Sequence, residues 1–93
     1  MNIMRIPGQN CGDVFLYALS TCVWCKKAKS FLDDLQVEYR YLDVDLVPAE
    51  ERDGVVAELA QRNPACSFPT IVVNNKDVIV GFKPEQLKEL LKR

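Results

Sequence analysis

The chain carries a pair of cysteines, Cys22 and Cys25, whose two-residue spacing fits a chemical role. Cys11 and Cys66, the other two cysteines, have no close partner in the sequence. The 93 residues include no histidine, which excludes Ser-His and Cys-His nucleophile pairs, histidine metal sites and haem attachment through a C-x-x-C-H motif. Any chemistry must therefore come from thiols, carboxylates, amines or hydroxyls.

The cysteine pair lies where a predicted strand ends and a predicted helix begins. Residues 14–18 form a continuous apolar run of strand length, typical of a strand that is buried on both faces. Ser20 and Thr21 follow and are of types that can cap a helix. Backbone N–H groups at a helix N-terminus are unpaired, and together with the helix dipole they favour an anion. This position therefore favours a thiolate at Cys22.

The two thiols are assigned different roles from their positions. A thiolate is the species that attacks disulfides, so Cys22 is assigned as the nucleophile, with Lys26 and Lys27 adding positive potential. Cys25 lies one helical turn further on and is assigned as the resolving thiol, which attacks the mixed disulfide formed at Cys22. Trp24 between them is either a substrate platform or a partly exposed aromatic residue without that role.

A structural zinc site is the main alternative for a C-x-x-C pair. Zinc usually takes four ligands, commonly supplied as two such pairs. Cys11 and Cys66 form no second pair and histidine is absent, so the sequence predicts no metal site.

The remaining sequence predicts the elements that position the pair. Ala28, Phe31, Leu32 and Leu35 follow the cysteines with the spacing of one helical face. The further elements follow in this order: a strand over about residues 37–43, a helix over 48–62, a strand at 71–73, a turn at 74–77, a strand at 78–80 and a helix from residue 84.

The resulting order βαβαββα predicts an α/β fold with a four-stranded mixed sheet and three helices. The first βαβ unit should be parallel and right-handed, and the last two strands should form an antiparallel hairpin. Residues 1–12 show no clear periodicity and are expected to be an irregular N-terminal extension to one domain over residues 13–93.

Charge and composition exclude several classes of protein. Lys and Arg number 12 against 13 Asp and Glu, and this net charge of −1 argues against nucleic acid or an anionic membrane as a partner. Apolar residues make up 48% of the chain, which excludes a disordered protein. No apolar stretch is long enough to span a membrane, and the first residues lack the apolar core of a signal peptide. The expected compartment is therefore the cytoplasm, and the chain is expected to act as a monomer.

Two residues further along the chain leave two interpretations open. Pro69 precedes a predicted strand and is either an ordinary strand-start proline or a cis-proline. Cys66, three residues earlier, is either a small buried apolar residue or a third thiol that modulates the site. Cys11 matches no motif and is expected to be incidental.

Four short motifs together resemble the glutaredoxin family of the thioredoxin fold. They are Val14-Phe15-Leu16-Tyr17, Cys22-x-x-Cys25, Phe68-Pro69-Thr70 and Val80-Gly81-Phe82, in the order and spacing of that family. The resemblance covers about residues 13–93 and implies a thioredoxin-like fold and a thiol–disulfide oxidoreductase that needs no cofactor. It also implies that the bond before Pro69 is cis and that this proline faces the cysteine pair.

The resemblance further implies a substrate groove beside the cysteines. In the family, the backbone of the residue before the cis-proline pairs with an extended substrate, and the turn at the final glycine lies beside the same groove. The residues expected to bind substrate are Trp24, Phe68, Pro69, Thr70, Gly81 and Phe82.

The chain departs from the family pattern at the positions that hold glutathione. Leu19 stands where the family usually has a lysine, and Lys83-Pro84 stands where it usually has an acidic pair. Val23-Trp24 replaces the usual Pro-Tyr between the cysteines. The stretch 81–85 is more similar to glutaredoxin-like redoxins that supply electrons to ribonucleotide reductase and are recharged by thioredoxin reductase. Glutathione is therefore expected to be a poor electron donor.

The sequence thus predicts an enzyme that reduces protein disulfides, with ribonucleotide reductase among the candidate substrates. The expected electron donor is thioredoxin reductase or a low-molecular-weight thiol. The alternative function is an iron–sulfur cluster or metal carrier that uses the same cysteines. Small C-x-x-C metallochaperones are a poorer match because their elements run βαββαβ.

Overall fold

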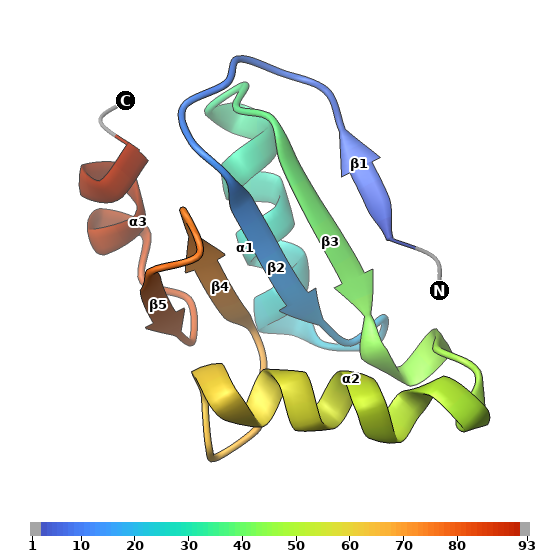
Figure 1. Ribbon diagram of the computed structural model, residues 1–93. Helices are drawn as coiled ribbons and strands as arrows, with labels where there is room; N and C mark the ends of the chain where they lie inside the picture. Colours follow the sequence, from blue (N-terminus) through green and yellow to red (C-terminus); the bar gives the residue numbers. More distant parts are fainter. Residues whose placement is uncertain (1–2, 92–93) are drawn as a thin grey trace.

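The computed structural model describes residues 3–91 and contains the predicted strands and helices in the predicted order, with two additional elements (Figure 1). The additions are a short first strand and a 3-10 turn. In chain order the elements are β1 (Met4–Ile6), β2 (Val14–Ala18), α1 (Val23–Asp34), β3 (Tyr39–Asp43), η1 (Val44–Leu46), α2 (Ala49–Arg62), β4 (Thr70–Val73), β5 (Asp77–Val80) and α3 (Pro84–Leu91).

The strands form one mixed sheet in the order β1-β3-β2-β4-β5. β2 and β3 are parallel and are joined through α1, whereas β4 and β5 form an antiparallel hairpin, so both predicted pairings are confirmed. The hairpin turns at Asn74 and Asn75, whose φ angles of 56° and 55° lie in the left-handed region that asparagine tolerates. β2 therefore lies at the centre of the sheet, between β3 and β4.

The prediction of four strands, with an irregular segment over residues 1–12, is wrong at residues 4–6. These residues form β1, which pairs antiparallel with β3, Met4 opposite Tyr41 and Ile6 opposite Tyr39. Three residues are too few to show the alternation by which a strand is predicted. After β1, the chain packs closely against the segment before β3, because a Cβ at Gly8 would lie 2.6 Å from the carbonyl carbon of Val37.

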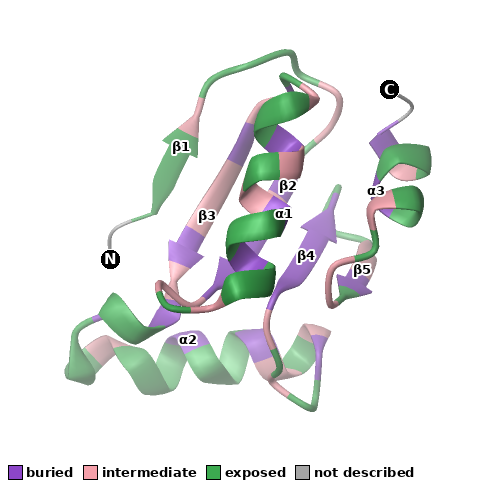
Figure 2. Cartoon of the chain, turned by 180° about the vertical axis from the view of Figure 1, so that it is seen from behind, coloured by how far each residue is buried: buried purple, intermediate pink, exposed green. Residues whose placement is uncertain are grey.

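Helices cover both faces of the sheet (Figure 2). α1 and α3 share one apolar cluster on the first face, which includes Leu32 of α1 and Leu87 of α3. α2 packs against the opposite face through Val55 and Leu59 and runs crosswise near the carboxyl ends of β2 and β3 (Figure 1). β2 is apolar throughout because its residues alternate between these two clusters, as Leu16 and Tyr17 illustrate.

Candidate active site

Cys22 is the residue at which the chain enters α1. It is the N-cap of the helix, with an extended backbone, and its carbonyl accepts a hydrogen bond of 3.1 Å from the backbone N–H of Lys26. Its sulfur accepts a hydrogen bond of 3.2 Å from the backbone N–H of Cys25. The half-buried sulfur of Cys22 therefore lies among the backbone N–H donors of a helix N-terminus.

Ser20 and Thr21, the cap candidates from residue type, do not cap α1, because Cys22 takes the N-cap position. The backbone N–H of Ser20 instead donates a 2.8 Å hydrogen bond to the carboxylate of Asp45, and its hydroxyl donates to the other oxygen of that carboxylate. These hydrogen bonds hold the pKa of Asp45 below its usual range. The loop that leads to Cys22 is thereby attached to η1, a contact between residues 25 positions apart that no local pattern reveals.

Cys25 lies behind Cys22, fully buried in the apolar cluster formed with α3. Burial raises the pKa of the Cys25 thiol to about 12, and the neighbouring Cys22 adds to this rise, while a backbone hydrogen bond from Leu19 and the charge of Lys29 oppose it. The two thiols are therefore chemically distinct. Cys22 is accessible and receives a backbone hydrogen bond, whereas Cys25 is held protonated and out of solvent.

The loop before β4 approaches the same end of the sheet. The Phe68–Pro69 peptide bond is cis, as the family resemblance implied. Thr70, the next residue, pairs with Tyr17 on β2, and five residues after Tyr17 the chain reaches Cys22. The carbonyl of Pro69 accepts a hydrogen bond of 2.8 Å from the backbone N–H of Gly81, so the cis-proline loop and the glycine turn are joined directly.

Buried hydrogen bonds fix the cis-proline loop to the end of α2. The Thr70 hydroxyl donates to the carbonyl of Ser67 at 2.8 Å and accepts from the side-chain amide of Asn63 at 3.0 Å. The same amide reaches the Ser67 hydroxyl at 3.0 Å, and Asn63 and Thr70 are both buried. The side chain of Thr70 thus supports the loop from inside. Its partner Asn63 is the C-cap residue of α2, and the sequence did not predict this contact.

Aromatic residues lie beside the cysteines on the solvent side. Trp24 is 55% exposed, its ring centre lies 6.3 Å from that of Phe82, and the ammonium of Lys27 lies 4.7 Å from the Trp24 ring centre. Phe82 also packs edge-on against Phe31 of α1 at 5.9 Å. Gly81, just before Phe82, has φ +86°, a conformation that favours glycine. The geometry brings Trp24 and Phe82 together and leaves both interpretations of Trp24 open.

An apolar groove runs between α2 and the cis-proline loop. Cys66 and Phe68 line it on the loop side, and Leu19 lines it next to the cysteine turn. Its other lining residues are Val44, Asp45, Arg52, Val56 and Leu59. Cys66 is partly exposed, has φ +52° and packs against the α2 cluster, so its thiol has access to this groove. Cys11 is half-buried and packs against the other cluster.

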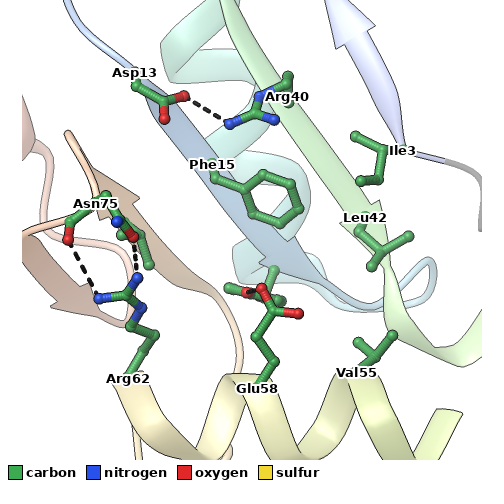
Figure 3. A pocket seen from close by; sticks show the side chains of 11 residues that line it. Ile3, Asp13, Phe15, Arg40, Leu42, Val55, Glu58, Arg62 and Asn75 are labelled. Carbon is green, nitrogen blue, oxygen red and sulfur yellow. Dashed lines mark hydrogen bonds and ion pairs between the residues drawn. The ribbon is translucent and has the colours of Figure 1, made fainter.

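A separate hollow lies on the α2 face of the sheet and contains no cysteine (Figure 3). Its charged side chains have partners around the ring of Phe15: Arg40 pairs with Asp13 at 2.7 Å, and Glu58 accepts a hydrogen bond of 3.2 Å from the Tyr17 hydroxyl. Burial, with the charge of Glu58, raises the pKa of Tyr17 to about 12. These contacts are structural, and we assign the hollow no part in the thiol chemistry.

Within residues 3–91, no group of three or more cysteine, aspartate or glutamate side chains is placed to hold a metal ion. In the same residues, no helix is both long and apolar enough to cross a membrane.

The fold and the site together define a class of protein. A central parallel pair joined by α1, a cysteine pair at the start of that helix, and a cis-proline loop at the same end of the neighbouring strand make up a thioredoxin-like fold with a dithiol site. A sequence model of the glutaredoxin family matches residues 14–78. The chain belongs to the glutaredoxin family, which confirms the resemblance carried by its motifs.

Known proteins agree with this assignment. The crystal structure of Methanosarcina acetivorans methanoredoxin is 44% identical, covers 92% of this chain and 90% of its own, and superposes with a TM-score of 0.89. The crystal structure of the glutaredoxin from Methanosarcina mazei is 41% identical and has a TM-score of 0.90. The match covers 100% of this chain and 90% of that protein. The Gene 56 protein of Mycobacterium phage D29 is 32% identical over 84% of this chain and 81% of its own length. Family and site together support thiol–disulfide oxidoreductase activity.

Proposed function

We propose that the chain reduces protein disulfides by dithiol exchange through Cys22 and Cys25. The observation that carries this proposal is the pairing of an accessible sulfur at a helix N-terminus with a buried thiol one turn later, linked by a 3.2 Å hydrogen bond from Cys25 N–H to Cys22 Sγ. An accessible anion suits attack on an external disulfide, and a protonated internal thiol suits its resolution.

The exchange has two steps. The Cys22 thiolate attacks one sulfur of the substrate disulfide, a Cys22–substrate bond forms, and the other substrate sulfur leaves as a thiolate and takes a proton from solvent. Cys25 then gives up its proton and attacks Cys22 Sγ, which releases the second substrate thiol and leaves a Cys22–Cys25 disulfide. Two electrons have passed to the substrate, and an external thiol donor must return them.

Substrate binding is assigned to the surface around Cys22. The exposed Trp24 and the half-buried Phe82 supply an aromatic face, and the backbone at Pro69 lies next to the Gly81 turn. Thr70 holds this loop through its buried hydroxyl. Val23 is 63% exposed beside Trp24, so this part of the rim of the site is apolar. An apolar rim favours a polypeptide that flanks its disulfide with apolar side chains. Ribonucleotide reductase remains one candidate of this kind.

Glutathione is not the proposed electron donor. Leu19 lines the apolar groove and offers no charge to a carboxylate, and Lys83 is exposed where the family usually places an acidic residue. The proposed donor is a thioredoxin reductase or another low-molecular-weight thiol, in a reducing compartment such as the cytoplasm.

The test is reduction of a peptide disulfide by catalytic amounts of the chain, with each donor supplied in turn. We expect turnover with at least one donor, and loss of turnover in a Cys22→Ser variant. Absence of turnover with every donor would contradict the proposal. A cluster-carrying function would instead give visible absorbance in freshly purified protein.

A further inference from the structure

One charged side chain beside the buried thiol has no role in the steps above. Lys29 follows Cys25 by four residues on α1, so both lie on the same side of the helix. Lys26 and Lys27 are exposed, whereas Lys29 is half-buried. Partial removal of a charge from water costs free energy unless the charge is paired.

The side chain of Lys29 is held in place by β3. Its ammonium nitrogen lies 3.1 Å from Oδ1 of Asp43, and the two side chains are 21% and 15% exposed. The same nitrogen lies 4.1 Å from the ring centre of Tyr41. Asp43 is paired in register with Ala18, the last residue of β2 before the turn to Cys22. The ion pair thus lies at the end of the sheet that carries the cysteines.

Two groups lower the pKa of Cys25: a backbone hydrogen bond from Leu19 and the charge of Lys29, which is the only side chain of the two. The buried residues of its cluster that come from β2, β4, β5 and α3 are apolar: Val14, Leu16, Ala18, Ile71, Val73, Ile79, Leu87 and Leu91. The titratable groups that pack against this cluster or lie near Lys29 are Cys11, Cys22, Lys29, Asp33, Tyr39, Tyr41 and Asp43. Burial raises the pKa of Cys25, and the charge of Lys29 acts in the opposite direction.

We propose that Lys29, held by Asp43 and Tyr41, is a positioning residue that stabilises the thiolate of Cys25 in the resolving step. This inference rests on the proposed function. In that step the Cys25 thiol loses its proton to solvent and its sulfur bonds to Cys22 Sγ. The bond from Cys22 to the substrate breaks, and the substrate sulfur leaves with the electron pair and is protonated. Lys29 keeps its proton throughout and contributes charge alone.

The two exchange steps can be separated with the aromatic disulfide DTNB in a stopped-flow instrument. Attack by Cys22 releases a first thionitrobenzoate at a rate that depends on DTNB concentration. Attack by Cys25 on the mixed disulfide releases a second thionitrobenzoate, at a rate that does not depend on DTNB concentration. All proteins in the experiment carry Cys11→Ser and Cys66→Ser, so that Cys22 and Cys25 are the remaining thiols.

The expected result is a selective effect of Lys29→Gln on the second release. A tenfold loss of thiolate should slow that release by about threefold, because a thiol of higher pKa is also the better nucleophile. Lys29→Arg keeps the charge and should restore the rate. Lys76→Gln, in the exposed turn at the far end of the β4–β5 hairpin, loses the same charge and should leave both releases unchanged.

The second release should accelerate with pH in each protein, with the Lys29→Gln profile displaced to higher pH. An unchanged second release in Lys29→Gln, or a slow one that Lys29→Arg does not restore, would overturn the inference. If Lys29→Gln does not fold, the double variant Lys29→Gln/Asp43→Asn removes both partners of the ion pair. The inference then requires the same slow second release in the double variant, and a normal rate would overturn it. If both releases behave as expected while peptide disulfides are not reduced, the proposed function fails and the role of Lys29 stands.

Discussion

The backbone N–H of Cys25 donates a hydrogen bond to the sulfur of Cys22 over 3.2 Å. The donor is a main-chain group, so a substitution at Cys25 that keeps α1 intact keeps this hydrogen bond to Cys22. The side chain of the same residue points into the apolar cluster, where burial raises its pKa to about 12. One residue therefore assists the attack with its backbone and completes the exchange with its side chain.

Cys66 should be dispensable for the exchange. The thiol lines the groove beside Phe68, but Cys22 and Cys25 complete the cycle without it. Cys66→Ser is expected to keep turnover within about twofold of the parent, measured as reduction of a peptide disulfide. Cys11→Ser is the matched control, because the Cys11 thiol is also half-buried but packs against the apolar cluster of α1 and α3. A large loss of activity in a folded Cys66→Ser variant, with Cys11→Ser active, would support the third-thiol interpretation.

Glutathione should be a poor donor because of the charge at Lys83. Lys83→Asp places a carboxylate where the family usually binds the glutathione ammonium group, and it should raise the kcat/KM for glutathione by about threefold to tenfold. Lys88→Asp, exposed on α3, makes the same charge change and should have little effect. Reduction of the chain by glutathione and by thioredoxin reductase is compared at equal concentrations of the two donors. Faster reduction of the parent protein by glutathione than by thioredoxin reductase would refute this account of the groove.

The buried thiol should make the reduced protein less stable at alkaline pH. The pKa of Cys25 is raised from its ordinary value of 9.0 to about 12, so above pH 9 the unfolded chain loses a proton that the folded chain retains. Folding stability is therefore lost as pH rises from 9 towards 12. The free energy of unfolding, measured with urea, should fall between pH 8 and pH 10.5 in both proteins. The fall should be about 1–2 kcal/mol smaller in Cys25→Ser than in the parent. Tyr17, with its pKa raised to about 12, and Tyr39, whose pKa burial also raises, account for loss common to both proteins. Equal losses in the two proteins would show that Cys25 ionises as readily when folded.

Asn63 should be important for stability although it carries no chemistry. Its side-chain amide donates to the hydroxyls of Ser67 and Thr70 inside the cis-proline loop. Asn63→Ala leaves the buried Thr70 oxygen with one partner fewer and should lower the free energy of unfolding by about 1–3 kcal/mol. Gln61→Ala, exposed on the same helix, should change it by less than about 0.5 kcal/mol. Equal unfolding midpoints for the two variants would contradict this role.

Much of the fold could be predicted because its elements carry their own patterns. The apolar run of β2 reflects burial on both faces, and the turn at Asn74 and Asn75 is local chemistry. β1 could not be predicted because three residues show no period and its pairing depends on the free edge of β3. Residue type pointed to the wrong helix cap, because hydroxyl residues are common caps. Ser20 instead hydrogen-bonds to Asp45, and Cys22 takes the N-cap position.

The cysteine pair could be found from spacing, and the cis-proline loop from motifs that resemble a family. The residues that support the cysteine pair and the cis-proline loop could not be found from the sequence. Asn63 supports Thr70 from the end of α2, and Asp43 fixes Lys29 from β3, 14 residues away. Such contacts depend on how separate elements meet in space, and an isolated lysine or asparagine has no local signal to mark it.

The central claim is that Cys22 attacks and Cys25 resolves, and trapping the intermediate tests it most directly. Cys25→Ser should react with a peptide disulfide and stop at the mixed disulfide, because the backbone donor to Cys22 remains while the resolving thiol is gone. Mass spectrometry of the digested adduct, alkylated below neutral pH, measures which cysteine carries the peptide. We predict that the peptide is attached to Cys22 and that Cys22→Ser gives no adduct. An adduct on Cys66 or Cys11 in the Cys25→Ser variant, or on Cys25 in Cys22→Ser at a comparable rate, would contradict the account.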